Sequence, residues 1–341
     1  AGFIGDRFSK KKVVGFSLLF WSVATVFTGM CSTLFQFILL RGVATGGGEA
    51  FYAPPAHALI STHHKKTRSL ALAIHQTAVY SGIILSGFIA GYIAEQYGWQ
   101  KAFFSFGFFG VLLALVIFKR LKNDLPQGNA TKFEFMETVR EITKKPTVIL
   151  LTIGFACMVF VNVGYLTWMP LLLIEKFGLS VSSAGFSSMF YHHIGAFIGV
   201  ILGGMLSDRF AAKNPVYRLV LQSLALLCAA PFIYSLGIAE TPRAMYIGLF
   251  LFGLFRGIYD SNIYASLYEL IRPQIRSSAA GIVLMFAFFT GAFSPYILGV
   301  LKPTLGLAAG ISWLWLSYFV GAIAIGIGII FFKRDRLPTV E

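Results

Sequence analysis

Charged residues are scarce in this chain. Only 12% of its 341 residues are Asp, Glu, Lys or Arg, whereas a soluble domain carries about 25%. Hydrophobic residues make up 57% of the chain and come in long uninterrupted runs. A single large soluble domain is therefore excluded, because its surface would need far more charge than the sequence holds.

Cysteine and the usual marks of an active site are also scarce. Cys31, Cys157 and Cys228 lie inside apolar runs, and no two of them stand in a CxxC spacing. We therefore expect free thiols, no disulfide framework and no metal site. The segment GVATGGGEA is rich in glycine but lacks the Lys-Ser/Thr of a phosphate-binding loop. With no nucleophile, metal or cofactor constellation in view, we expect no cofactor and no enzyme activity.

What the chain does have is ten apolar runs. A helix needs about 20 apolar residues to cross roughly 30 Å of hydrocarbon. Backbone groups in lipid must be paired within the protein, so spanning runs form helices or closed barrels. Barrel strands are about 10 residues long and alternate in polarity, which these runs do not. The sequence therefore predicts an all-α membrane protein with spans over residues 13–31, 34–61, 69–94, 99–118, 147–174, 182–207, 216–238, 244–271, 277–301 and 306–332.

The charges that are present lie mostly in the loops between these runs. A net charge of +14 is also found in nucleic-acid-binding proteins, but here the basic residues gather on no one face or domain, so no nucleic-acid partner is expected. Loops on one side hold most of the 28 Lys and Arg. Because cytoplasmic loops are the more basic ones, we expect the N-terminal motif, the central linker and the C-terminus to be cytoplasmic in a multi-pass protein of a bacterial inner membrane. The opposite loops hold only Lys101, Lys176, Arg243 and Lys302.

Internal matches divide the chain into two parallel halves. GFIGDRFSKKK at Gly2 matches GMLSDRFAAKN at Gly204, and the segment that begins at Arg68 matches the one that begins at Arg276. Parallel repeats of six helices build one large class of transporters. We therefore expect an N-terminal half bundle over 1–118, a cytoplasmic linker over 119–146, a C-terminal half bundle over 147–334 and a cytoplasmic tail over 335–341.

The two halves are not equally long. The second half has six spans, and its copy of the repeated motif follows its second span. The first half has four spans, and its copy of the motif opens the chain, so we expect the first helix and most of the second to be missing. In the linker, the stretch KFEFMETVREITKK has the pattern of a short amphipathic surface helix.

The repeated motif resembles one of a known family. GFIGDRFSKKK is similar to the G-x-x-x-D-R-x-G-[RK]-[RK] motif between the second and third helices of the major facilitator superfamily, which has a weaker copy between helices eight and nine. The resemblance implies two parallel six-helix repeats and a gate latch on the inner side, in which the Asp accepts bonds from the N-terminal amides of a neighbouring helix. The matching residues are Gly2, Asp6, Arg7, Lys10 and Lys11 in the first copy and Gly204, Asp208 and Arg209 in the second.

A second resemblance lies in the segment RGVATGGGEAFYAPPAHALI. It looks like the fourth-helix signature of the anion:cation symporters and spinster-like carriers, in which an Arg is followed by a glycine run and a Glu. The spacing from Arg41 to Glu49 is eight residues here, one longer than in those groups. The resemblance implies proton coupling at Glu49. Arg41 stands about 10 Å from the inner end of its span by helix rise, and its side chain can alternatively extend to the membrane surface.

Ionisable residues inside spans are costly in lipid and mark the paths of substrates or ions. Glu49 lies near mid-membrane, with a structural partner of an Arg as the alternative role. Arg256 and Asp260 are four residues apart and share a helix face, and a self-contained ion pair is the alternative there. Asn162, Tyr165 and Asn262 accompany them as candidates for the substrate or proton path, with interfacial packing as the alternative for the first two. Histidines that can relay protons near neutral pH are His75, His192 and His193.

These observations together favour a secondary active transporter that moves a small organic solute by alternating access. An organic or sugar-derived anion fits best, because Arg41 and Arg256 supply positive charge and Glu49 and Asp260 supply carboxylates for symport of a proton. We expect a monomer in the lipid bilayer. Two alternatives stay open: a spinster-like lipid carrier, and a non-transporting membrane sensor on the same fold.

Overall fold

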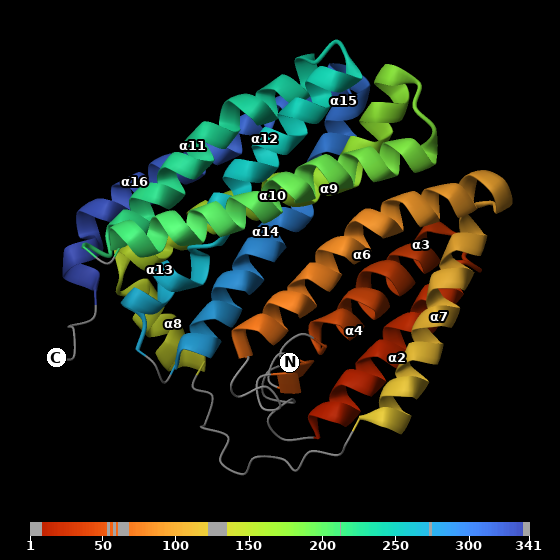
Figure 1. The fold of residues 1–341 in the computed structure, drawn as a ribbon, viewed down its shortest axis with the longest axis horizontal. Helices are drawn as coiled ribbons and strands as arrows, with labels where there is room; N and C mark the ends of the chain where they lie inside the picture. Colours follow the sequence, from red (N-terminus) through yellow and green to blue (C-terminus); the bar gives the residue numbers. More distant parts are fainter. Residues whose placement is uncertain are drawn as a thin grey trace. The chain divides into compact units, whose positions relative to one another are not determined.

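The computed structural model of the chain is built of helices, and no strand occurs among the residues that it describes. These are residues 9–52, 55–56, 59–60, 68–121, 135–211, 213–272 and 275–336. Two compact units make up the chain, residues 1–133 and residues 134–341 (Figure 1). The expectation of an all-α membrane fold is confirmed.

In the first unit, helix α2 (Lys10–Thr28) packs along α7 (Trp99–Arg120). The two backbones approach closely because Gly107 has no side chain: a Cβ there would lie 2.8 Å from the carbonyl oxygen of Ser22. Helix α7 follows α6 directly at Gly98, whose φ of 85° lies in the region that favours glycine. The remaining helices of this unit are α3 (Leu34–Phe37), the π-helical segment η1 (Ile38–Thr45), α4 (Gly46–Ala50) and α6 (Arg68–Tyr97).

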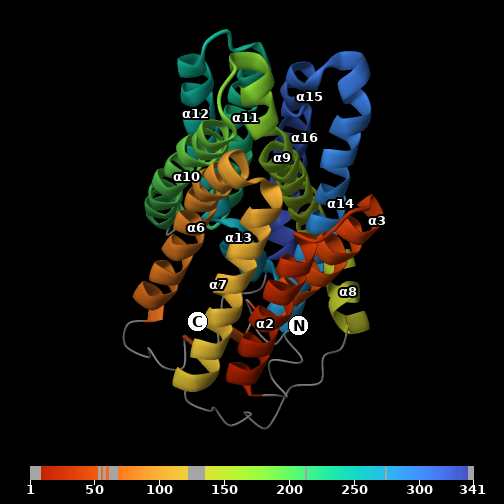
Figure 2. The ribbon, with the colours of Figure 1, turned by 90° about the vertical axis from the view of Figure 1, so that its right-hand side faces the viewer.

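The second unit is a larger bundle with a continuous buried core. Helix α9 packs on α14 and α16, and α12 packs between α10 and α11, an arrangement that can be followed in Figures 1 and 2. The helices of this unit are α8 (Phe135–Thr143), α9 (Pro146–Phe177), α10 (Val181–Ala211), α11 (Tyr217–Ile238), α12 (Pro242–Asp260), α13 (Ile263–Leu270), α14 (Arg276–Leu305), α15 (Leu307–Trp313) and α16 (Trp315–Asp335).

Within the described part of the chain, 8 helical stretches are long and apolar enough to cross a membrane. The other two predicted spans are 34–61, in which α3, η1 and α4 follow one another without a gap as far as Ala50, and 244–271, in which Ser261 and Asn262 separate α12 from α13. In the second of them α12 ends at Asp260, because the side chains that follow bond locally. Ser261 Oγ donates to the Ile258 carbonyl at 2.8 Å, and Asn262 Nδ2 donates to Ser261 Oγ at 2.9 Å. Such local bonds compete with the helical hydrogen bonds of the backbone.

The amphipathic helix predicted in the linker is confirmed as α8. Its Thr138 and Ile142 are buried, whereas Met136 and Arg140 are exposed. An arginine just after α13 holds this helix to the bundle.

That arginine is Arg272, which donates from Nη2 to Glu137 at 2.7 Å and from Nε to Glu141 at 2.6 Å. These two bonds raise the pKa of the Arg272 guanidinium above its ordinary value, because each carboxylate favours the charged form. Lys145 adds an ion pair to Glu141 at 3.7 Å. These ion pairs therefore hold α8, the first helix of the second unit, against the connection between α13 and α14.

Asp335, at the end of α16, binds the beginning of α9. Its Oδ2 accepts a hydrogen bond from the buried backbone amide of Thr147 at 2.9 Å, one of the amides at a helix N-terminus that have no partner within their own helix. Asp335→Ala is expected to lower the free energy of unfolding by about 1 to 3 kcal/mol, because it leaves a buried donor unsatisfied. Asp335→Asn keeps an acceptor oxygen and serves as the control in thermal unfolding in detergent. Equal melting temperatures of the wild type and Asp335→Ala would show that the bond contributes nothing.

Candidate functional site

An ion pair lies inside the membrane-spanning bundle of the second unit. Arg256 Nη2 stands 3.2 Å from Asp260 Oδ2, one turn further along α12, and the side chains are only 14% and 18% exposed. The sequence prediction that these two residues share a helix face is thus confirmed. A mostly buried guanidinium in an apolar helix keeps its charge, since arginine does not deprotonate in proteins. The carboxylate is its counter-ion within the same helix.

A third residue, His192 of α10, completes the cluster. Its Nε2 lies 3.1 Å from Arg256 Nη1. Helix α10 can bring the imidazole this close because α12 presents glycines toward it. A Cβ on Gly253 would lie 2.0 Å from the His192 carbonyl oxygen, and one on Gly257 would lie 2.1 Å from that of Ala196. The two helices therefore touch backbone to backbone, which is the known use of small residues in membrane bundles.

Aromatic rings enclose the imidazole. The His192 ring centroid lies 4.6 Å from that of Tyr165 on α9 and 4.6 Å from that of Phe252 on α12. Tyr165 and Phe252 are themselves in edge contact at 5.6 Å. The Tyr165 hydroxyl donates to the carbonyl of Ser188 on α10. Three helices thus fix the ring, and Tyr165 serves as a wall of the cluster whose own hydroxyl is already bonded.

Some buried polar atoms of the second unit have no hydrogen-bond partner among the described residues. They include Asp260 Oδ1, His192 Nδ1, the Tyr318 hydroxyl on α16 and Asn162 Oδ1 on α9. The Tyr318 ring is in edge contact with that of Phe252, with the ring centroids 5.7 Å apart. Buried polar groups without a partner are uncommon in folded proteins. A site that combines a fixed cation, a carboxylate with a free oxygen and a hydroxyl is suited to bind a small anion and a proton.

Asn262, predicted to accompany this pair, has a different environment. It is fully buried, and its Nδ2 bonds to Ser261 and to the Ile258 carbonyl at the break after α12. These contacts fit a role in ending α12, two residues beyond Asp260. Asn262 Oδ1 nevertheless has no partner in the described part of the chain.

In the first unit, Arg41 and Glu49 are both exposed. Arg41 lies in η1, with its guanidinium carbon 5.9 Å from the centroid of the Phe103 ring, and Glu49 lies in α4. The π-helical bonding of η1 explains their spacing of eight. One π-turn holds about one residue more than an α-turn, so eight residues through η1 make about two turns. The extra residue therefore leaves Arg41 and Glu49 on the same side of the helix.

The repeated motif is only partly described. Gly2, Asp6 and Arg7 lie outside the described residues. Lys10 begins α2 and is largely buried, Lys11 is half-buried, and Asp208 and Arg209 are exposed near the end of α10. Gly204 has open space where a Cβ would stand. The bond between Asp335 and the Thr147 amide involves neither copy of the motif, so the latch implied for Asp208 stays a prediction.

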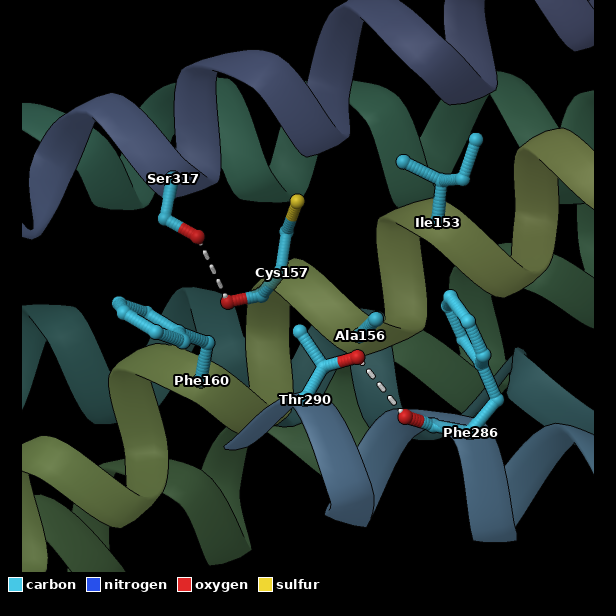
Figure 3. Close-up of a pocket in the computed structure, with 7 residues that line it drawn as sticks. All are labelled: Ile153, Ala156, Cys157, Phe160, Phe286, Thr290 and Ser317. Atoms are coloured by element: carbon cyan, nitrogen blue, oxygen red, sulfur yellow. Dashed lines mark hydrogen bonds between the residues drawn. The ribbon is translucent and has the colours of Figure 1, made fainter. Parts of the chain in front are cut away.

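A cavity of about 280 Å³ opens between α9, α14 and α16, away from the charged cluster. Its walls are apolar apart from two hydroxyls and a thiol, and both hydroxyls are bonded to backbone carbonyls (Figure 3). None of the residues predicted for the substrate path lines it. The lining residues are Ile153, Ala156, Cys157, Phe160, Phe286, Thr290 and Ser317.

Sequence reasoning named His192 but did not pair it with Arg256. The indicator for that pairing was present as glycines four apart on both helices, Gly195 and Gly199 on α10 and Gly253 and Gly257 on α12. Tyr318 was missed altogether, because a lone tyrosine in an apolar run is ordinary core. Among the described residues, no group of three His, Cys, Asp or Glu side chains is placed to hold a metal ion.

A multi-pass helical bundle with charged residues held inside its spans is the architecture of a membrane transporter. The family model of the Major Facilitator Superfamily matches residues 1–221 and again residues 175–341. The chain belongs to the Major Facilitator Superfamily.

Relatives within the superfamily fall into different groups. Protein spinster homolog 1 of Xenopus tropicalis is 26% identical over 379 residues, covering 98% of this chain and 71% of the relative. An MFS-type efflux pump of Mycolicibacterium smegmatis is 25% identical, covering 99% and 81%. The "Probable galactarate/D-glucarate transporter GudP" of Escherichia coli is 22% identical, covering 89% and 75%.

The fold has a close counterpart among solved structures. A bacterial homolog of the human lysosomal transporter Spinster, in an inward-facing and unoccupied conformation, superposes with a TM-score of 0.84 at 20% identity. The match covers 99% of this chain and 87% of that one. It supports the major-facilitator fold.

Proposed function

We propose that the chain is a secondary active transporter that moves a small organic anion together with a proton. The observation that carries this proposal is the Arg256–Asp260 pair, held inside a membrane bundle with His192 on the other side of the guanidinium. A purely structural ion pair needs no third partner and no unpaired oxygen, and Asp260 Oδ1 is unpaired within the described residues. An apolar span tolerates such charges when they serve transport.

The proposed coupling of anion and proton follows from the different partners of the two terminal nitrogens of Arg256. Nη1 faces His192 and Nη2 faces Asp260. An incoming carboxylate competes with Asp260 for Nη2, because both are anions that bind arginine by charge-assisted hydrogen bonds. Once displaced, the Asp260 carboxylate has lost its counter-ion, and its burial favours the protonated form. Binding of one anionic group is thereby linked to uptake of one proton, which is the basis of symport.

The similarity to the transporter named for galactarate and D-glucarate favours a sugar-derived dicarboxylate, and D-glucarate is the probe of choice. We expect proteoliposomes containing the full-length protein to accumulate labelled D-glucarate when the lumen is made alkaline, and all transport assays below use that protein. No accumulation of any organic anion under a pH gradient would refute the proposed function.

A spinster-like lipid carrier is the second candidate. It is favoured by the spinster relatives and by the apolar cavity between α9, α14 and α16. Transfer of a labelled lysophospholipid between vesicle leaflets, without any D-glucarate uptake, would support this candidate over the first.

In the first unit, we propose that Arg41 and Glu49 act in substrate or proton movement from the shared helix side that η1 creates. In the second unit, the path at the Arg256–Asp260 pair includes Asn162, Tyr165 and Asn262. At the inner face, we propose that the two copies of the repeated motif, with Asp6 and Arg7 in the first and Asp208 and Arg209 in the second, form the gate latch. The N-terminal motif, the linker and the C-terminus then lie in the cytoplasm, beneath the inner membrane, and the carrier acts as a monomer.

Glu49→Gln is expected to abolish pH-driven accumulation of D-glucarate while leaving exchange of labelled for unlabelled D-glucarate intact. Glutamine keeps the size of the side chain and resembles the protonated acid, but it cannot release a proton. Glu240→Gln, in the exposed turn before α12, is the control and should change neither activity. Normal uphill accumulation by Glu49→Gln would assign Glu49 a structural role.

A further inference from the structure

We propose that His192 is a positioning residue that works only as a neutral imidazole protonated on Nδ1. In that form its Nε2 accepts a hydrogen bond from Arg256. This bond holds the guanidinium in place while the substrate anion replaces Asp260 as its anionic partner. The inference deepens the proposed function, since it rests on Arg256 as the group that binds the substrate anion. It assigns His192 no part in carrying the proton.

The tautomer follows from the partner. A guanidinium has five N–H donors and no acceptor, so Nε2 of His192, 3.1 Å from Arg256 Nη1, must offer its lone pair. The single proton of the neutral ring is then on Nδ1. An imidazolium would place an N–H donor against an N–H donor and a second positive charge beside the first. His192 therefore cannot be protonated while Arg256 occupies this position.

Neighbouring side chains from two other helices enclose the His192 ring. His192 is fully buried, and Tyr165 and Phe252 contact it from α9 and α12 at 4.6 Å each. Nδ1 of His192 has no hydrogen-bond partner among the described residues, so the contact of Nε2 with Arg256 Nη1 decides which ring nitrogen carries the proton. The backbone contact at Gly253 fixes α10 against α12 at this level. The ring is thus held by packing, and it holds Arg256 in turn.

Asp260 and His192, the two partners of the guanidinium, have different roles in this arrangement. Asp260 is on the same helix as Arg256 and can be exchanged for the substrate anion. His192 is on a neighbouring helix, is neutral and does not compete for an anion. When the contact between Asp260 and Nη2 is lost, Nη1 remains bonded to His192. Nη2 therefore keeps its position and can bind the substrate anion. Without His192, Nη1 of Arg256 loses the hydrogen bond that fixes its direction.

The tautomer can be observed directly, without any substrate. The chain is labelled with nitrogen-15 histidine, purified in detergent micelles at about pH 7, and its ring nitrogens are recorded by NMR. Loss of one set of signals in His192→Gln assigns that set among the 6 histidines. We expect a protonated Nδ1 and an unprotonated Nε2 for His192. In the charge-neutral double variant Arg256→Met/Asp260→Asn, we expect the ring to move toward the Nε2–H tautomer that free imidazoles prefer.

Three results would overturn the proposal: an imidazolium at His192 in the wild type, a wild-type ring protonated on Nε2, or a Nδ1–H ring that the double variant leaves unchanged. The double variant removes both charges at once, so neither is left buried alone. Its folding is checked by its elution as a single species and by its melting temperature. Should it fail to fold, the wild-type spectrum still decides whether the ring is the required tautomer.

Transport kinetics then separate positioning from proton transfer. In His192→Leu the acceptor is lost, and we expect the apparent KM for D-glucarate to rise at least about tenfold, the range for a lost hydrogen bond to a charged group. In His192→Gln an amide oxygen can replace Nε2, so the KM should recover and the number of protons moved per D-glucarate should stay that of the wild type. Loss of proton coupling in His192→Gln would make His192 a proton carrier and refute the proposal. A wild type that takes up no D-glucarate refutes the proposed substrate alone, because the NMR result stands independently of it.

Discussion

Replacing Arg256 with methionine is expected to abolish D-glucarate uptake and to destabilise the chain. Arg256 and Asp260 are 3.2 Å apart and mostly buried. Removal of one partner of such a pair leaves an uncompensated buried charge, which costs about 3 to 5 kcal/mol. The same change removes the cation that the proposed anion site needs. Thermal unfolding in detergent and uptake into proteoliposomes measure the two effects separately.

The control for Arg256→Met is the double variant Arg256→Met/Asp260→Asn. Without either charge, the bundle should regain most of the lost stability, because a neutral pair of similar volume can replace a buried ion pair at little or no cost. Uptake should nevertheless remain absent. Restored uptake in the double variant would show that the pair is structural and that the anion binds elsewhere. Uptake at the wild-type rate by Arg256→Met alone would lead to the same conclusion.

The second large effect is expected for Gly257→Ala. A Cβ on Gly257 would lie 2.1 Å from the Ala196 carbonyl oxygen and 2.8 Å from the Val200 amide nitrogen. Both are backbone atoms of α10, so only a shift of one helix against the other can make room. Overpacking of this kind costs about 1 to 3 kcal/mol. The shift also moves His192 away from Arg256, and D-glucarate uptake is expected to fall at least about tenfold.

Gly281→Ala is the matched control, because Gly281 lies within α14 and has no atom within 4 Å of the position that its Cβ would take. Alanine is the better helix former by about 1 kcal/mol, so Gly281→Ala should leave stability unchanged or raise it, with normal uptake. Equal behaviour of the two variants would mean that the close contact of α10 and α12 does not position the site.

The predicted spans matched the helices of the structure closely, because each span needs an apolar length set by the bilayer. The run over 147–174 became α9, Pro146–Phe177, and the run over 182–207 became α10, Val181–Ala211. The break after Asp260 was not predicted. It depends on Ser261 and Asn262 bonding to each other and to Ile258, and hydropathy does not register such bonds between neighbouring residues.

Of the candidate site, only the part that lies along one helix could be predicted. Arg256 and Asp260 are one turn apart, so helix geometry alone brings them together. His192 is 64 residues away from Arg256 in the sequence, and its pairing depends on how two helices cross. The glycines that set this crossing are visible in the sequence, but glycines are frequent in all membrane helices. Their partners could therefore be identified only from the packed structure.

The hydrogen bond between Asp335 and the first turn of α9 could not be predicted either, because it also joins residues that are far apart in the sequence. Asp335 stands in a charged tail whose residues look like an ordinary cytoplasmic end, and Thr147 is 188 residues away from it. The spacing of Arg41 and Glu49, in contrast, is visible in the sequence as eight residues. Its structural basis, the π-turn of η1, requires backbone hydrogen bonds that no sequence pattern shows.

Proton movement during D-glucarate uptake is the measurement that bears most directly on Arg256 and Asp260 as a shared site for anion and proton. Proteoliposomes loaded with a pH-sensitive dye report the protons that accompany labelled D-glucarate. The wild type should move protons with D-glucarate, whereas Asp260→Asn should exchange D-glucarate across the membrane without any proton movement. Asparagine keeps an oxygen for Arg256 but cannot take up a proton. Substrate-linked proton movement at the wild-type ratio in Asp260→Asn would contradict the assignment of Asp260 as the carboxylate that couples the two.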